Sequence, residues 1–203
     1  MVEVLRWYGI SNKRILSVMG RIPRHLFIPE SFRNHENAYS DHPSPIGEGQ
    51  TISQPYVVAY MTEKLAIKSN DKVLEIGSGS GYQAAVLAGM GARVYTVEII
   101  PALAAHAQGV LTRLGYADQV QIRLGDGYQG WPEEAPFDAV IVTCAPENVP
   151  EALIAQLRES GTMIVPTGVW MDQRLVILQK KNGRIEKNDD LPVRFVPMVH
   201  GRP

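Results

Sequence analysis

Short apolar segments alternate with segments of helical periodicity through the middle of the chain, and this alternation constrains the fold more than any other feature. Strands are predicted at 72–76, 93–97, 120–124, 137–142 and 161–166. Helices are predicted between them at 82–90, 101–114 and 150–158. Strand–helix–strand units of this length form parallel sheets that are covered by helices on both faces.

The N-terminal part does not follow this alternation. Two short helices are predicted, one beginning near Val2 and one capped by Ser11. Residues 27–50 carry prolines and glycines without a sustained period, so we expect a long ordered loop there. A helical pattern begins at residue 54, and Pro55 suits its first turn because proline lacks the N–H that would be unpaired at that position.

The C-terminal part is predicted to be antiparallel. Asn182-Gly183 is a strong two-residue hairpin turn between strands predicted at 173–180 and 184–187. A short acidic loop and an extended piece at 193–198 follow. We therefore expect one α/β domain over residues 1–203, with a doubly wound, mostly parallel sheet of about seven strands, an antiparallel C-terminal hairpin and an N-terminal helical extension. Residues 1–53 would form the extension and its loop, and 54–203 the core.

Composition narrows the possible functions and locations. Lys and Arg total 20 against 21 Asp and Glu, a net charge of −1, which argues against a strongly basic nucleic-acid binder. The single cysteine, Cys144, excludes an internal disulfide, and no apolar run reaches the ~18 residues of a membrane span. Glu3 stands where a signal peptide would have basic residues. We expect a soluble, cytoplasmic monomer that binds neither nucleic acid nor membranes.

Three glycines follow the first predicted strand in Val73-Leu-Glu-Ile-Gly-Ser-Gly-Ser-Gly-Tyr82. Gly77, Gly79 and Gly81 allow a sharp turn that brings a ligand against main-chain N–H groups. A dinucleotide fingerprint would need a sixth-position glycine where this chain has Tyr82, so a pyrophosphate site is disfavoured. A tight turn without a ligand remains the alternative for this motif alone.

Two acids sharpen the interpretation. Glu98 ends the second predicted strand of the core, where an acid can accept both hydroxyl protons of a ribose cis-diol. Asp126, followed by Gly127, ends the third, where it could accept from an adenine amino group. Ligands bind at the carboxyl ends of strands in open parallel sheets, so a nucleoside site is expected, although each acid alone could be a surface turn residue.

These motifs resemble those of S-adenosylmethionine-dependent methyltransferases. More specifically, Gly47-Glu-Gly-Gln-Thr-Ile-Ser-Gln-Pro55 resembles the signature of the protein-L-isoaspartate (D-aspartate) O-methyltransferase family. The segments 24–29, 38–39 and 192–198 are also similar to that family. The resemblance runs from about Leu16 to the C-terminus and implies a Rossmann-like methyltransferase fold.

The resemblance also implies an activity and a set of residues. The family transfers a methyl group from S-adenosyl-L-methionine to the α-carboxylate of L-isoaspartyl residues in damaged proteins and peptides, which begins their repair and leaves S-adenosyl-L-homocysteine. Ser53 would be the catalytic serine, and no metal is implied. The implied cofactor-binding residues are Gln50, Thr51, Ile52, Ser53, Glu75, Gly77, Gly79, Gly81, Glu98, Asp126 and Gly127. The implied substrate-binding residues are Ile46, Ser53, Val196 and Pro197.

The chemistry of this reaction agrees with the residues found. A carboxylate is ionised at neutral pH and needs no general base, so the enzyme chiefly has to position it. We hypothesise that the Ser53 hydroxyl, with free N–H groups at the start of the following helix, donates to the substrate carboxylate. The alternative is that Ser53 only caps that helix. Cys144 is expected to pack as a small apolar side chain.

Other functions stay open from the sequence. One is a methyltransferase for a small-molecule carboxylate or a nucleic acid, although Thr143-Cys-Ala-Pro146 replaces the Asn/Asp-Pro-Pro-Tyr typical of nitrogen methylation. Another is a nucleoside-binding module without catalysis. A nicotinamide dehydrogenase is disfavoured by Tyr82.

Overall fold

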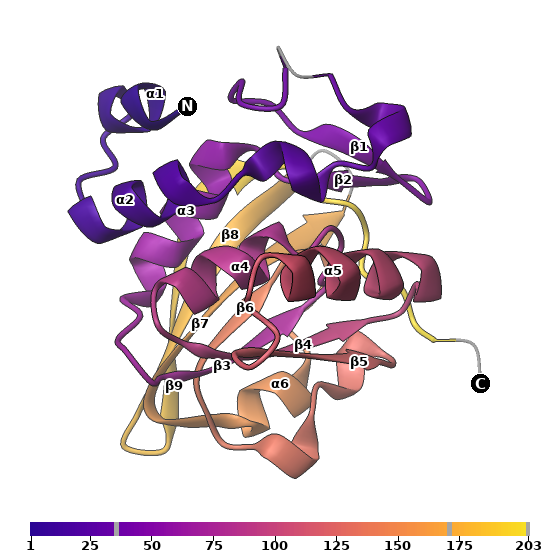
Figure 1. The fold of residues 1–203 in the computed structure, drawn as a ribbon. Coiled ribbons are helices and arrows are strands. Elements are labelled where there is room, and N and C mark those ends of the chain that lie inside the picture. The colour runs from indigo at the N-terminus through magenta and orange to yellow at the C-terminus, as the bar shows by residue number, and fades with distance from the viewer. Residues whose placement is uncertain (35–36, 170–171, 202–203) are drawn as a thin grey trace.

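The computed structural model describes residues 1–34, 37–169 and 172–201. A seven-stranded sheet with the order β5-β4-β3-β6-β7-β8-β9 lies at its centre (Figure 1). The first five strands in this order run parallel, and β8 and β9 are antiparallel to their neighbours. The strands are β3 (Lys72–Ile76), β4 (Arg93–Glu98), β5 (Val120–Leu124), β6 (Phe137–Val142), β7 (Leu157–Val169), β8 (Asp172–Lys181) and β9 (Arg184–Val193). The predicted fold class is confirmed.

The helices divide unequally between the two faces of the sheet. They are α1 (Val2–Trp7), α2 (Lys13–Arg21), α3 (Pro55–Leu65), α4 (Tyr82–Gly89), α5 (Pro101–Arg113) and α6 (Glu151–Ala155). Successive side chains of a strand point to opposite faces, so Val73 packs with residues of α1 to α5 whereas Leu74 packs with Leu153 of α6. Figure 1 shows α6 on the other side of the sheet from α4 and α5. Two short 3₁₀ helices, η3 (Gly127–Gln129) and η4 (Pro132–Glu134), link β5 to β6.

The expected loop over 27–50 is more regular than predicted. It is preceded by a 3₁₀ turn, η1 (Arg24–Phe27), and contains a second, η2 (Glu30–Phe32). Its C-terminal part contains the strand β1 (Ser44–Gly47), which forms a two-stranded antiparallel hairpin with β2 (Gln50–Ile52). The prolines and glycines conceal this hairpin, because a proline within a run argues against a strand and the turn requires positive φ at Glu48 and Gly49.

A buried arginine anchors this segment. The Arg24 side chain is fully buried; its Nε donates to the carbonyl of Ala38 at 2.9 Å and its Nη2 to that of His42 at 3.4 Å. Its guanidinium carbon lies 5.0 Å from the centre of the Tyr82 ring, a cation–π contact. Arg24 therefore ties residues 38–42 to the start of α4, and burial lowers the pKa of its guanidinium.

Several predicted boundaries are wrong. Asn12, not Ser11, caps α2, because its side-chain oxygen accepts from the N–H groups of Arg14 and Ile15. Helix α6 stops at Ala155, and the following strand begins at Leu157, where it pairs with Phe137. These departures arise from cap and strand contacts that sequence periodicity does not contain.

At the other end, the predicted acidic loop is strand. Asp189 and Asp190 lie within β9, where Asp189 pairs with Val176. Between Val193 and residue 201, where the description of the chain ends, the only strand pairing is an isolated parallel bridge from Pro197 to Ala145. Among the described residues, no helix has the length and apolar character needed to cross a membrane.

Candidate functional site: a cofactor cavity joined to an open groove

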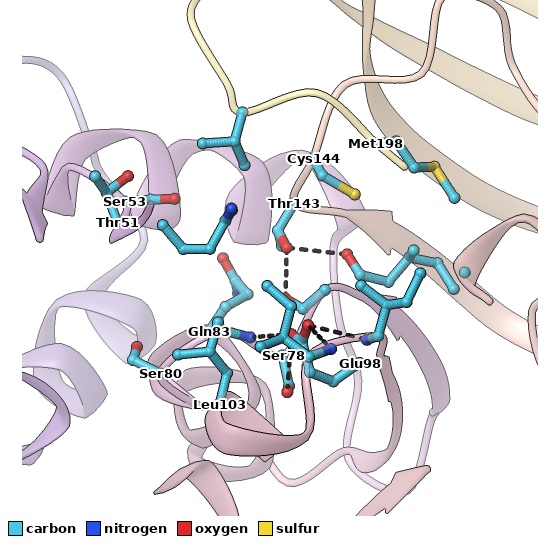
Figure 2. A pocket seen from close by; sticks show the side chains of 18 of the residues that line it. Thr51, Ser53, Ser78, Ser80, Gln83, Glu98, Leu103, Thr143, Cys144 and Met198 are labelled. Carbon is cyan, nitrogen blue, oxygen red and sulfur yellow. Dashed lines mark hydrogen bonds between the residues drawn. The ribbon is translucent and has the colours of Figure 1, made fainter. Parts of the chain in front are cut away.

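A cavity opens at the carboxyl ends of β3, β4 and β6 (Figure 2). Ligands of doubly wound sheets bind at this edge, outside the carboxyl ends of the strands. Figure 2 shows Thr51 and Ser53 on one side of it and Glu98 on the other. The predicted residues in its wall are Gln50, Thr51, Ile52, Ser53, Gly77, Gly79, Glu98, Gly127, Val196 and Pro197.

The glycine turn makes part of this wall from main chain. Gly77 has φ of 91°, and a Cβ there would lie 2.7 Å from Thr143 Oγ1. That hydroxyl lies 2.6 Å from the carbonyl oxygen of Gly77 and 2.9 Å from that of Ile76, and donates to these carbonyls. Thr143 therefore holds the turn closed against β6, and a side chain at position 77 would force the turn and β6 apart.

Glu98 is the charged group of the wall. Its carboxylate accepts the N–H of Gly79 at 2.8 Å, that of Ile99 at 2.9 Å and that of Ile100 at 3.0 Å. The residue is only 5% exposed, and what is exposed faces the cavity. Three backbone donors fix the carboxylate at the end of β4, where a cis-diol could donate to it.

The remaining wall is largely apolar. Leu103, Met198 and Val199 line it, and sequence reasoning misses them because they are ordinary apolar residues on α5 and the C-terminal segment. An adenosyl group has a flat base, which the apolar surface can cover, and a cis-diol, which Glu98 can bind. The site therefore suits an adenosyl group. The residues present thus fit S-adenosylmethionine.

Cys144 also lines the cavity, next to Thr143. Burial raises the pKa of its thiol to about 12, and repulsion from Glu98 acts in the same direction. The thiol therefore stays protonated at neutral pH, so it is a poor nucleophile. Both residues follow β6 directly, so the rule that ligands bind at strand ends could have identified them.

Glu75, predicted to bind the cofactor, is absent from the cavity wall. Its side chain is fully buried, and neither carboxylate oxygen has a hydrogen-bond partner; the hydroxyl of Thr96, its register partner on β4, has none either. Burial, opposed by the nearby Thr96 hydroxyl and supported by repulsion from Glu98, raises the pKa of Glu75 to about 8. Glu75 therefore carries a proton at neutral pH.

Asp126 lies beside the cavity rather than in its wall, although Gly127 lines it. One oxygen of the Asp126 carboxylate accepts the N–H of Tyr128 at 2.9 Å, and the other accepts that of Gly201 at 3.2 Å. The His200 ring, which stacks on Tyr128 at 3.8 Å, is 3.4 Å from the same carboxylate. In this structure Asp126 holds the C-terminal segment.

Two further predicted residues serve packing. Ile46 is 2% exposed, and its Cδ1 atom would lie 3.5 Å from a Cβ on Gly79, so it supports the glycine turn from behind. A Cβ on Gly81 would lie 3.1 Å from that of Ala107, which shows that Gly81 permits the close approach of α4 and α5. Neither Ile46 nor Gly81 lines the cavity.

Ser53 does not cap helix α3. The cap position is Gln54, whose amide donates to Asp41 Oδ2 at 2.7 Å, while Asp41 Oδ1 accepts the N–H of Tyr56 at 2.8 Å. Pro55 has no N–H, so the helix start offers fewer free donors than we expected. Within the described part of the chain, the Ser53 hydroxyl makes no hydrogen bond and remains available to a ligand.

An open groove meets the cavity at Ser53. It follows the end of β9 and the residues after it on one side and α3 on the other, with Tyr56, Val57, Leu191, Val193 and Phe195 as its apolar lining. The residues that line both the groove and the cavity are Thr51, Ser53, Thr143, Val196 and Pro197. A group bound in the groove can therefore meet a group bound in the cavity at this shared lining.

The family model described as "Protein-L-isoaspartate(D-aspartate) O-methyltransferase (PCMT)" matches residues 1–203. The chain belongs to this family. A protein-L-isoaspartate O-methyltransferase from Gloeobacter violaceus is 52% identical over 202 residues, which cover 99% of this chain and 97% of that one. Another, from Methanoculleus marisnigri, is 50% identical and is matched over 98% of this chain and 90% of its own.

Solved structures of family members have the same fold. One protein-L-isoaspartate O-methyltransferase superposes with a TM-score of 0.87 at 32% identity, covering 97% of this chain and 64% of that longer one. A family member from Plasmodium falciparum, solved with S-adenosyl-L-homocysteine, superposes with a TM-score of 0.86 at 28% identity, covering 98% and 96% of the two chains. The family's methyltransferase fold is thus shared over nearly all of this chain.

Proposed function

We propose that this protein transfers the methyl group of S-adenosylmethionine to the α-carboxylate of L-isoaspartyl residues in damaged proteins and peptides. The observation that carries this proposal is the position of Ser53, whose unpaired hydroxyl lies in the wall common to the cavity and the groove. The membership of this chain in the protein-L-isoaspartate O-methyltransferase family supports the same activity.

The cofactor supplies, when bound, a methyl group on a positively charged sulfur that is already a good leaving group. Glu98 and the main chain around Gly77 and Gly79 would hold and orient the cofactor in the cavity. The isoaspartyl carboxylate enters from the groove, where the Ser53 hydroxyl donates a hydrogen bond to one oxygen and leaves the other free to attack. Positioning of this kind contributes about 7–11 kcal/mol to lowering a barrier, so no general base is required.

The groove suits a polypeptide better than a small carboxylate. It is open, and the extended backbone of Val196 and Pro197 runs along its junction with the cavity, where it can hold the isoaspartyl unit. A small-molecule carboxylate would leave the apolar surface of Tyr56 and Phe195 in contact with water. We further propose that the protein acts as a monomer in the cytoplasm and needs neither nucleic acid nor a membrane.

The test uses paired peptides that differ only in an isoaspartyl or an aspartyl linkage, together with labelled S-adenosylmethionine. We expect base-labile label on the isoaspartyl peptide alone, because a methyl ester hydrolyses in base. Label on neither peptide, with cofactor binding retained, would point to a nucleoside-binding module. Equal label on both peptides, or on free dicarboxylic acids, would point to a less selective carboxyl methyltransferase.

A further inference from the structure

Four aromatic rings form a row that leads from the groove to helix α1. We call Trp7, Tyr8, Tyr56 and Tyr60 the aromatic row. The ring centres of Trp7 and Tyr8 are 5.1 Å apart, those of Tyr8 and Tyr56 5.4 Å, and those of Tyr56 and Tyr60 5.8 Å. Successive rings are therefore in contact, although they come from α1 and α3, which are far apart in the sequence.

The outer end of the row is open to solvent. Trp7 is 81% exposed and Tyr8 is 45% exposed. An exposed tryptophan contributes little to the core, and Trp and Tyr are the residues most enriched where proteins bind partners. Folding alone therefore does not account for the position of Trp7.

Tyr56 lines the groove and joins the row to it, whereas the neighbouring Tyr60 lies outside the groove lining and is fixed to β9. The Tyr60 hydroxyl donates to the carboxylate of Asp190 on β9, whose oxygens are 2.7 and 2.9 Å away. The ammonium of Lys64 lies 5.0 Å from the centre of the Tyr60 ring. Since Tyr56 also lines the groove, the row continues the groove's apolar surface outward.

The length of the row corresponds to a stretch of peptide. An extended chain advances about 3.3 Å per residue, so the two ring-to-ring steps from Tyr56 to Trp7, of 5.4 and 5.1 Å, span about three residues, to which the stretch from Ser53 to Tyr56 adds. Mixed charges surround the row, with Glu3 and Arg6 on α1 and Lys64 and Asp190 near Tyr60. Apolar contact rather than charge would therefore select what binds there.

We propose that the aromatic row docks an unfolded stretch of the substrate polypeptide, through apolar or aromatic side chains about four to six residues from the isoaspartyl residue. This inference rests on the proposed function and adds a preference to it. A damaged protein that has unfolded exposes apolar side chains, whereas a folded one conceals them, so the row favours unfolded substrates.

The experiment compares three kinds of isoaspartyl peptide. The first is a short peptide that cannot reach the row. The second carries Leu and Phe four to six residues from the isoaspartyl residue, on the N-terminal side in one version and on the C-terminal side in another. The third replaces these residues with Ser. KM and kcat are measured for the wild type, Trp7→Ala, Tyr8→Ala, Trp7→Phe, and Leu124→Ala as a control.

Leu124 is a suitable control because it is 56% exposed and lies on β5, at the opposite edge of the sheet from β9. We expect the apolar flank on one side to lower KM by about five- to tenfold relative to the Ser flank, with kcat unchanged. Trp7→Ala and Tyr8→Ala should each reduce this advantage, while Trp7→Phe and Leu124→Ala should keep it. Thermal unfolding of each variant verifies that it is folded.

Turnover of the short peptide separates the two proposals. If no variant or wild type methylates it, the proposed function fails, whatever the row does. If the short peptide is methylated equally by wild type and Trp7→Ala, but apolar and Ser flanks give equal KM on both sides, the docking inference is overturned. Concentration-dependent dimerisation that Trp7→Ala abolishes would also overturn it, because the row would then bind a second copy of the chain.

Discussion

The Asp41 carboxylate accepts the backbone N–H of Tyr56 at 2.8 Å and so caps helix α3 from a residue 15 positions earlier in the chain. Its second oxygen accepts from the Gln54 side chain at 2.7 Å. Ser53 immediately precedes Gln54. The cap therefore fixes the residue on which methyl transfer is proposed to depend, and it frees Ser53 from a capping role.

Replacing Asp41 by Ala should reduce both stability and turnover. We expect the free energy of unfolding to fall by about 1–2 kcal/mol, as for other lost caps. For a chain of this size that lowers Tm by about 2–8 °C. We expect kcat to fall by about tenfold, since Ser53 loses its support. Asp71→Ala is the control, because it removes a similar bond to the Lys68 N–H, 2.8 Å long, in a turn before β3. Equal loss of kcat in both variants would argue against positioning through Asp41.

Replacing Ser53 by Ala should slow methyl transfer without weakening cofactor binding. A hydrogen bond to a charged group contributes about 1.5–3 kcal/mol, which corresponds to roughly a 10- to 100-fold lower kcat. The Kd for S-adenosylhomocysteine, measured by calorimetry, should stay within about twofold. Ser80→Ala removes another hydroxyl from the cavity wall and should leave kcat nearly unchanged. An unaltered rate in Ser53→Ala would reject the proposed role.

Glu75 should make stability depend on pH. Because burial raises its folded-state pKa from 4.5 to about 8, the protonated form stabilises the fold at low pH. That contribution is complete below about pH 4.5 and is lost as the pH rises through about 8. Glu75→Gln cannot ionise, so its free energy of unfolding should rise relative to wild type by up to about 4 kcal/mol between pH 5 and 9. Urea titrations across this range measure the difference, and a constant difference would contradict the expectation.

Cys144 should resist alkylation in the folded protein. Its thiol pKa of about 12 leaves almost no thiolate at pH 8. Iodoacetamide should therefore react at least about 100-fold more slowly with the native chain than with the urea-denatured chain. Mass spectrometry follows the modification, and the chain contains no other cysteine to confuse it. Comparable rates in both states would show that the thiol is accessible and ionised.

Features encoded in neighbouring residues could be predicted from the sequence. The apolar run at β3 and the three glycines after it define the turn, and Glu98 at the end of β4 falls in the cavity wall. Residues 50–53 of the signature segment likewise line the cavity. These predictions succeed because strand ends and glycine turns are local patterns.

Features that depend on distant contacts could not be predicted. The Asp41 cap takes the place of the alternative role of Ser53 as a helix cap, and no local pattern in the sequence indicates that a carboxylate 15 residues earlier binds the helix start. The sequence predicts Asp126 beside an adenine amino group, and in the structure its side chain accepts the N–H of Gly201. In both cases the side chain has the predicted chemistry, but tertiary structure selects its partner.

The buried Arg24 guanidinium has a consequence for how this protein tolerates change. Its hydrogen bonds to the carbonyls of Ala38 and His42 fix the path of residues 38–42, although this segment is neither helix nor strand. An insertion or deletion between Ala38 and His42 would leave the buried Arg24 guanidinium without its hydrogen-bond acceptors. Library screens should therefore find fewer viable length variants there than in the Asn182-Gly183 turn.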